Sequence, residues 1–251
     1  MDIPAYLQRI HYQGSLEPTA QTLRDLHVAH QLAVPFENLS IFLGQPIVLD
    51  AEALFAKIVG RRRGGFCYEL NGLFAALLRE LGFRVDMLSA GVAHPGGVFG
   101  PEFDHMVLMV SLEQRWLADV GFGDAFREPL LLDEPNEQRQ NERAFQIAPD
   151  GPYRTLLRRD DGGDWRVRYR FTLQPHRMAD YQRMCLFHQT SPQSPFTQRR
   201  TCSLATPDGR ITLTDMRFIR TGADGEREER ALTSEEEYRS ILREQFGIID
   251  P

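Results

Sequence analysis

Apolar residues recur at two different spacings along this 251-residue chain, and the spacing changes from one third of the chain to the next. In the first third they follow the three- and four-residue steps of helices that bury one face. The helix that carries leucines and phenylalanines up to Leu81 is followed by Gly82, a residue that commonly ends helices. Helices are expected at residues 3–12, 19–34, 51–59 and 67–81.

The middle third changes to short apolar runs rich in β-branched residues, which are typical of strands. Only Glu113 and Gln114 separate two of these runs, so we expect the two to form a hairpin. A polar turn is expected at residues 160–164. Strands are expected at residues 84–92, 103–112, 115–120, 145–147, 154–159 and 165–173.

The last third mixes both patterns. A helix is expected at residues 178–189, and a hairpin joins 201–205 to 210–218 through Pro207-Asp208-Gly209. A final helix at residues 234–246 begins with a serine–glutamate capping box. The pattern changes near residues 83 and 190, where the composition is not that of a linker. We therefore expect three subdomains packed together.

Composition and charge narrow the possible partners. The net charge of −6 gives no reason to expect binding to nucleic acid or to an anionic membrane. The first residues lack the basic-then-apolar pattern of a signal peptide, and no apolar run approaches the roughly 20 residues of a membrane span. The three cysteines form no CxxC pair and do not cluster with histidines, so we expect no metal site, and a cytoplasmic protein.

Cys67 is the first candidate for chemistry. It follows Gly64 and Gly65 at the point where a long helical pattern begins. A helix N-terminus presents unpaired N–H groups and the positive end of the helix dipole, which favour the reactive thiolate. The alternative is that Cys67 is a small buried apolar residue, as many free cysteines are.

His105 and Asp119 follow Cys67 in the order that a thiol enzyme requires. Each lies on a strand-like run, and the expected hairpin brings the two runs side by side. Histidine can take and return the thiol proton, and a carboxylate can fix the tautomer and orientation of the ring. Taken singly, His105 can be a core histidine and Asp119 a turn residue before glycine. The ordered set of three favours a catalytic triad.

Several segments resemble the arylamine N-acetyltransferase family. The segment Arg63-Gly64-Gly65-Phe66-Cys67-Tyr68-Glu69-Leu70-Asn71 is similar to its active-site signature, and Val34-Pro35-Phe36-Glu37-Asn38-Leu39 is similar to a second family segment. His105-Met106, Asp119-Val120-Gly121-Phe122-Gly123 and Ser194-Pro195-Phe196 resemble further motifs. The resemblance runs from about residue 5 to about residue 220.

The resemblance implies an α+β fold of three domains: a helical bundle at 1–83 with the nucleophilic cysteine, an antiparallel β-barrel-like domain at 84–190 with the histidine and aspartate, and an α/β lid at 191–251. It implies a papain-like Cys-His-Asp arrangement. It also implies acetyl-CoA as co-substrate with no permanently bound cofactor, an arylamine or hydrazine as acceptor, and a ping-pong reaction through an acetyl-cysteine.

The resemblance also assigns roles to residues around the triad. Phe36, Phe122 and Phe196 match substrate-pocket positions, although each can equally be a core residue. Arg63 and Glu37 are either a buried pair that positions the Cys67 loop, together with Gly64 and Gly65, or two solvated surface charges.

Other functions share parts of this pattern. A papain-like hydrolase or a transglutaminase has the same order of cysteine, histidine and aspartate, but acts on peptide or glutamine acyl groups. A macrolactam amide synthase is a divergent function within the same family fold. A binding module without activity is the last alternative, and the intact triad argues against it.

Overall fold

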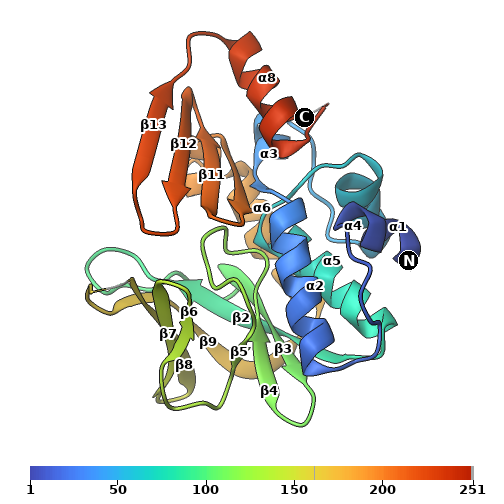
Figure 1. Ribbon diagram of the computed structural model, residues 1–251, viewed down its shortest axis with the longest axis vertical. Helices are drawn as coiled ribbons and strands as arrows, with labels where there is room; N and C mark the ends of the chain where they lie inside the picture. The colour runs from blue at the N-terminus through green and yellow to red at the C-terminus, as the bar shows by residue number, and fades with distance from the viewer. Residues whose placement is uncertain (161, 250–251) are drawn as a thin grey trace.

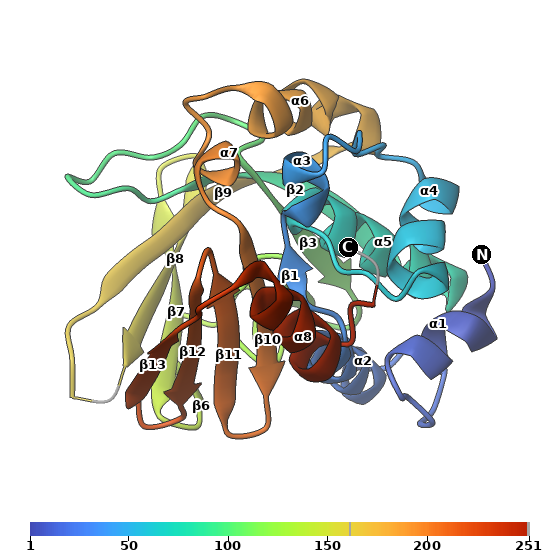
Figure 2. The same cartoon turned by 90° about the horizontal axis from the view of Figure 1, so that it is seen from above.

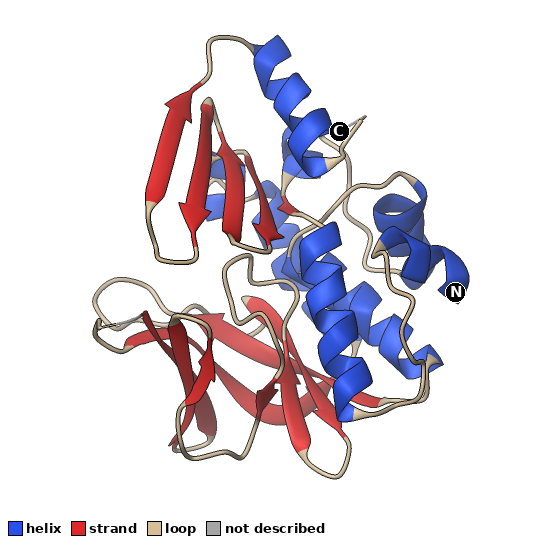
Figure 3. Cartoon of the chain, in the orientation of Figure 1, coloured by secondary structure: helices blue, strands red, loops and turns tan. Residues whose placement is uncertain are grey.

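Two antiparallel sheets and a group of helices make up the fold (Figures 1 and 3). The structure is a computed structural model that describes residues 1–160 and 162–249. Asp161, in the turn expected at residues 160–164, and the last two residues of the third predicted domain lie outside the described residues. No helix in the described ranges is long and apolar enough to cross a bilayer.

Helices dominate the first third, as the spacing predicted. Side chains of Asp2, Thr19 and Asp50 accept hydrogen bonds from the first turns of three of these helices, which satisfies N–H groups without a helical partner. Helix α5 is buried along most of its length, so it forms the centre of the bundle. The helices are α1 (Ile3–Arg9), α2 (Ala20–Ala33), α3 (Leu39–Phe42), α4 (Ala51–Phe55) and α5 (Cys67–Glu80).

The helix expected at residues 51–59 changes its winding halfway. After α4 the chain continues as a π-helix over Ala56–Gly60. This wider turn includes Lys57, whose side chain is buried. The pattern of apolar residues could not reveal the change, because α- and π-helical turns bury similar residue types.

The middle third forms an eight-stranded, barrel-like sheet in the order β5-β4-β3-β2-β9-β8-β7-β6, seen at the bottom of Figure 1. The expected hairpin of β3 and β4 is present, with Leu108 opposite Ala118. Its strands are β2 (Arg84–Val92), β3 (His105–Ser111), β4 (Arg115–Ala118), β5 (Leu130–Leu131), β6 (Gln138–Gln140), β7 (Arg143–Asp150), β8 (Tyr153–Asp160) and β9 (Arg166–His176).

The last third supplies most of a five-stranded sheet, ordered β1-β10-β11-β12-β13 and packed against helix α8 (Figure 2). Its edge strand β1 comes from the first third and pairs with β10, Glu37 opposite Cys202. The elements are β1 (Phe36–Glu37), β10 (Thr201–Thr206), β11 (Gly209–Thr214), β12 (Arg217–Gly222), β13 (Arg227–Ala231) and α8 (Glu235–Phe246).

Two details of the last third differ from the sequence prediction. The single strand expected at residues 210–218 is two strands, because the chain turns at Asp215, which has a φ of 45°. Strand β13 was not predicted, since all five of its residues are exposed and four of them are charged. Such charges protect a sheet edge from pairing with other chains.

The helices between β9 and β10 pack against the bundle. A 3₁₀ turn (Met178–Tyr181) leads into α6 (Gln182–Thr190), followed by the short α7 (Pro195–Gln198). Tyr181 and Cys185 belong to the same hydrophobic core as α5. The division of the chain at residues 83 and 190 therefore remains a prediction.

Candidate active site

Cys67 is the first residue of α5, and its side chain is buried, with 3% of the residue exposed. Glu69, in the first turn, accepts a hydrogen bond from the Phe66 N–H over 3.1 Å and fixes the start of the helix. The two preceding glycines are required by close packing. A Cβ on Gly64 would collide with the carbonyl oxygen of Pro35, and one on Gly65 would lie 2.7 Å from the Glu69 Cβ. These contacts define the path of the chain into the helix.

Four buried charges support this path. Arg63 Nε donates to Glu37 Oε1 at 3.1 Å, and Nη2 lies 2.9 Å from the same oxygen; both side chains are almost fully buried. Lys57, on the π-helix, donates to Glu69 at 2.8 Å and lies 3.7 Å from Glu37. The two cations and two carboxylates compensate one another, which a buried charge requires. Arg63 and Glu37 are thus a buried pair and not surface charges.

His105 and Asp119 form a second buried pair next to the start of α5. His105 Nε2 lies 2.8 Å from Asp119 Oδ2, and the two residues are 2% and 1% exposed. The other carboxylate oxygen accepts hydrogen bonds from Asn71 Nδ2 at 2.9 Å and from the Gly121 N–H at 3.0 Å. This arrangement leaves His105 Nδ1 as the ring nitrogen that Asp119 does not contact.

Asn71 ties this pair to the helix of Cys67. It lies four residues after the cysteine, about one helical turn, and its Nδ2 also donates to the Met106 carbonyl at 2.7 Å. Its Oδ1 accepts from the Val120 N–H at 2.9 Å. Gly121 packs directly on the helix start, since a Cβ there would lie 2.8 Å from the Cys67 Cα. One asparagine therefore holds the strands of both His105 and Asp119 against α5.

A neutral histidine supports Asp119 from the side of helix α2. The Asp119 N–H donates to His27 Nε2 over 3.0 Å, so this nitrogen carries no proton, and His27 Nδ1 donates to the Arg127 carbonyl over 2.9 Å. Burial lowers the pKa of His27 to about 4, which keeps the ring neutral near pH 7. The backbone of Asp119 is thereby fixed independently of its side chain.

The ionisation of the candidate triad follows from burial and neighbouring charge. Burial, and then the carboxylates of Asp104 and Asp119, raise the pKa of the Cys67 thiol, and a hydrogen bond with the Met106 backbone offsets this only in part. Burial also opposes ionisation of Asp119, but the contact with His105 and the hydrogen bonds to its carboxylate hold its pKa below the usual value. Burial and the two carboxylates therefore oppose the thiolate that the helix N-terminus is expected to favour, and the ionisation of Cys67 stays a prediction.

Comparison with known proteins identifies the family. A family model described as N-acetyltransferase matches residues 19–249. The arylamine N-acetyltransferase / N-hydroxyarylamine O-acetyltransferase of Salmonella typhimurium is 35% identical over 249 residues, which cover 97% of this chain and 88% of the relative. The human arylamine N-acetyltransferase 1 is 35% identical over 275 residues, covering 99% and 94%. The chain belongs to the arylamine N-acetyltransferase family.

Solved structures agree with this membership. The arylamine N-acetyltransferase of Mycobacterium marinum in complex with CoA superimposes with a TM-score of 0.91 at 34% identity, over 99% of this chain and 93% of that one. The enzyme from Mycobacterium tuberculosis gives a TM-score of 0.92 at 33% identity, over 98% and 94%. The predictions of an arylamine N-acetyltransferase fold and of an acyltransferase enzyme are confirmed.

In this family member, the three phenylalanines expected at a substrate pocket fall into two groups. Phe122 lies beside His105, with ring centroids 5.2 Å apart, and both rings contact the buried Tyr169. Phe36 and Phe196 pack together at 6.2 Å and line an open cavity of about 430 Å³. All three are only half-buried, so each can offer part of its ring to a ligand.

Several residues at the site were not identified as functional from the sequence. Asn71 stands inside the cysteine signature, and its spacing of four residues from Cys67 is the signal that would have found it. Lys57 is a charge within an apolar helical run, which is a weaker signal. His27 and Tyr169 are ordinary core residues by pattern. Within the described residues, no group of three or more histidine, cysteine or acidic side chains has the geometry to hold a metal ion.

Proposed function

We propose that this enzyme transfers the acetyl group of acetyl-CoA to the nitrogen of an arylamine or hydrazine, in two steps, through an acetyl thioester on Cys67. The relatives' names support the arylamine acceptor, and the CoA complex of the Mycobacterium marinum enzyme supports the donor. Cys67, His105 and Asp119 are the proposed catalytic residues. The observation that carries the proposal is the network in which Asn71, one helical turn after Cys67, holds Asp119 and thereby His105.

In the first step His105 Nδ1 takes the thiol proton while Cys67 Sγ attacks the thioester carbonyl of acetyl-CoA. Burial disfavours the thiolate, so a base that takes the proton is needed for the sulfur to act as nucleophile. Asp119, through its contact with Nε2, stabilises the imidazolium that results. When the carbon–sulfur bond to CoA breaks, His105 returns the proton to the departing sulfur. The products are CoA and acetylated Cys67.

In the second step the amine nitrogen attacks the carbonyl of acetylated Cys67, and His105 takes one of its protons. The bond from carbon to Cys67 Sγ then breaks, and the sulfur receives that proton. N–H groups at the start of α5 are the proposed donors to the negative oxygen in both steps. An arylamine suits this step because it is largely unprotonated near neutral pH and remains nucleophilic.

The proposed acceptor site lies between the two groups of aromatic residues. Phe122 is the proposed wall next to His105, and Phe36 and Phe196 the proposed wall on the side of the third domain. Flat apolar ligands bind well between aromatic rings. Arg63, Glu37, Gly64 and Gly65 are proposed to act indirectly, by fixing the loop before Cys67.

Intact-protein mass spectrometry tests the two-step scheme. Incubation with acetyl-CoA alone should add one acetyl group, located on Cys67 by peptide mapping, and addition of an arylamine should remove it and release the N-acetyl product. A direct-transfer enzyme would stay unmodified with acetyl-CoA alone. A hydrolase would lose the acetyl group to water at the same rate with or without the amine.

A further inference from the structure

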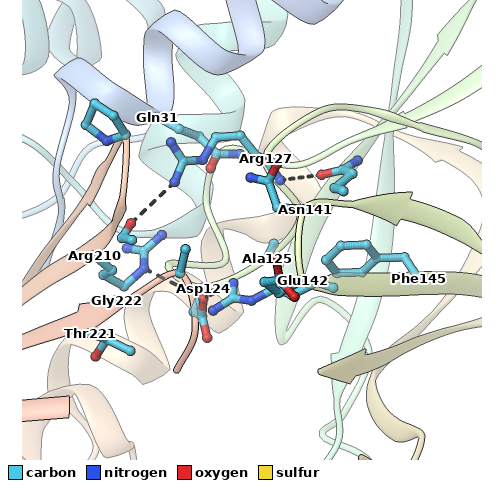
Figure 4. Close-up of a pocket in the computed structure, with 15 residues that line it drawn as sticks. Gln31, Asp124, Ala125, Arg127, Asn141, Glu142, Phe145, Arg210, Thr221 and Gly222 are labelled. Carbon is cyan, nitrogen blue, oxygen red and sulfur yellow. Dashed lines mark hydrogen bonds and ion pairs between the residues drawn. The ribbon is translucent and has the colours of Figure 1, made fainter. Parts of the chain in front are cut away.

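A small cavity lies between the barrel-like sheet and the five-stranded sheet. Its volume is about 60 Å³, enough for several water molecules or for one anion of phosphate size. The loop after β4, the β6–β7 turn, the turn before β11 and the turn after β12 surround it. Figure 4 shows Arg210 beside Asp124, with Arg127 on the other side of Arg210.

Arginines gather at and around this cavity, although the chain has a net charge of −6. The arginine cluster consists of five residues, Arg127, Arg143, Arg158, Arg168 and Arg210. The carboxylates close to it are Asp124 and Asp160, and Glu142 lines the cavity. Of these residues, only Arg127, Arg143, Arg210, Asp124 and Glu142 line the cavity, so its lining carries one uncompensated positive charge, and Arg158 and Arg168 add further positive charge nearby.

The carboxylate of Asp124 is fully used by two of these arginines. Arg143 donates to its Oδ1 atom at 2.8 Å, and Arg158 donates to Oδ2 at 2.7 Å. Arg210 Nε lies 3.7 Å from Oδ1, too far for a hydrogen bond. Burial alone would raise the pKa of Asp124, and the arginines lower it well below its usual value. Asp124 is therefore a permanent anion that organises the cluster without neutralising it.

Two guanidinium groups keep N–H donors for another acceptor. Arg210 donates to Ser203 Oγ at 3.0 Å, and Arg127 donates through one nitrogen to the carbonyls of Thr206 and Gly209. A guanidinium has five N–H donors, so most of them remain unused. Arg168, which does not line the cavity, has a buried Nε with no hydrogen-bond partner among the described residues.

Repulsion between the arginines contributes to lowering their pKa values. Burial, together with neighbouring arginines, lowers the pKa of Arg210 to about 10 even though Asp124 opposes the change. The same causes, burial first and another arginine next, lower the pKa of Arg127 and of Arg168. All three stay protonated at pH 7, and a bound anion would relieve the repulsion.

We propose that this cavity is a binding site for a phosphate-class anion, held by Arg210 and Arg127 with Arg143 at its edge. Forked guanidinium donors match the oxygens of phosphate, which is why arginine is favoured at such sites. The anion is either a phosphate group of the acyl donor or free phosphate. The first source rests on the proposed use of acetyl-CoA; the second does not.

The cavity is also connected to Asp119 of the proposed triad. Gln31, Ala125 and Arg210 line both this cavity and a smaller one that reaches Asp119. The carbonyl of Arg127 accepts the hydrogen bond from His27, whose other nitrogen accepts from the Asp119 N–H. An anion bound here is thus in contact with the residues that hold the Asp119 backbone.

Thermal unfolding in sodium phosphate, compared with sodium chloride at equal ionic strength, tests the site itself. A ligand that binds only the folded state raises the Tm. We expect phosphate to raise the Tm of the wild type above its value in chloride. Arg210→Gln should weaken phosphate binding about tenfold or more, and the affinity of Arg210→Lys for phosphate should lie between those of the wild type and Arg210→Gln. Arg210 does not hydrogen-bond Asp124, so these variants should fold. Arg115→Gln, which removes an exposed ion pair on β4, is the control and should respond as the wild type does.

Kinetics with two acyl donors identify the source of the bound anion. If the anion belongs to the donor, Arg210→Gln raises the ratio of KM for acetyl-CoA to KM for acetyl-pantetheine, which has no phosphate, about tenfold. An unchanged ratio with lost phosphate stabilisation assigns the site to free phosphate. Equal stabilisation by phosphate and chloride in the wild type, or an equal phosphate effect in Arg210→Gln, overturns the proposal. Mass spectrometry of Cys67 after incubation with acetyl-pantetheine tests the proposed acetyl transfer independently of the anion site.

Discussion

Asn71 Nδ2 donates to Asp119 Oδ1 over 2.9 Å, so the helix that begins with Cys67 also holds the carboxylate that contacts His105. Nucleophile, base and orienting group are therefore joined by one rigid element and one side chain. This relationship, more than the order of the three residues along the chain, makes specific predictions possible.

Asp119→Asn should lower the rate of Cys67 acetylation by about 10² to 10⁴; the corresponding exchange in serine-protease triads costs about 10⁴ in kcat. The new amide keeps an oxygen for Asn71 and Gly121, so its NH₂ group must face His105 Nε2. That contact places the ring proton on Nδ1, the nitrogen that has to accept the thiol proton. The single-turnover rate and the Tm are the measurements. An almost unchanged rate would make Asp119 a turn residue, and a strongly lowered Tm would make its role structural.

Cys67→Ala should abolish acetyl transfer, whereas Cys185→Ala and Cys202→Ala should keep most of it. All three cysteines are buried, so the comparison controls for loss of volume in a core. Cys185 packs in the helical core, and Cys202 lies on β10 beneath α8. Steady-state rates with one arylamine decide the matter, and a comparable loss in either control would refute the assignment.

His105→Ala should strongly slow alkylation of Cys67 by iodoacetamide near pH 7 and shift its rise to higher pH. Burial raises the pKa of the thiol, so without a base to take the proton little thiolate forms. The experiment is a pH profile of the alkylation rate for wild type and variant. Superimposable profiles would exclude His105 as the proton acceptor.

Gly121→Ala should reduce activity more than a change of one methyl group usually does. The added Cβ would lie 2.8 Å from the Cys67 Cα and 2.9 Å from its carbonyl oxygen, and these backbone atoms cannot move aside without displacing Asn71 or Asp119. Gly60→Ala is the matched control, because a Cβ at that exposed glycine meets nothing within 4 Å. Equal activities of the two variants would contradict the close approach.

The enzyme should lose stability as the pH falls from about 6.5 to about 4, owing to two buried histidines. Burial lowers the pKa of His27 to about 4 and that of His30 to about 3, against about 6.5 in the unfolded chain. Because the folded-state pKa values lie below the unfolded value, the contribution of the two histidines to the free energy of unfolding is complete well above pH 6.5. It is lost progressively as the pH falls from there toward 4. At pH 5 each histidine accounts for a loss of about 2 kcal/mol.

Urea unfolding of His30→Gln tests this origin of the acid sensitivity. Between pH 7.5 and pH 5 the free energy of unfolding of the variant should fall by about 2 kcal/mol less than that of the wild type. His94→Gln, at an exposed histidine, should have the wild-type slope. A wild-type slope in His30→Gln would assign the acid sensitivity to other groups.

The parts of the fold that follow local patterns were predictable from the sequence. Amphipathic spacing gave the helices, and the short connection at Glu113 gave the hairpin of His105 and Asp119. Strand β13 was not predictable, because none of its residues is buried. The residues that position the catalytic residues were not predicted, for a related reason. His27 and Lys57 acquire their roles only through contacts with segments distant in the sequence, and no local pattern records those.

Strand β1 has a consequence for the order in which the active site forms. It contributes an early segment of the chain to a sheet made mostly of late ones, and Asn38 accepts a hydrogen bond from the Thr201 N–H, 163 residues further on. A bridge from Phe36 to Gly65 continues from that strand to the loop before Cys67. Contacts between such distant segments form late in folding, because closing a long loop costs entropy. During synthesis, therefore, a nascent chain that has not yet reached β10 contains Cys67 but lacks the strand that β1, next to the loop before Cys67, pairs with.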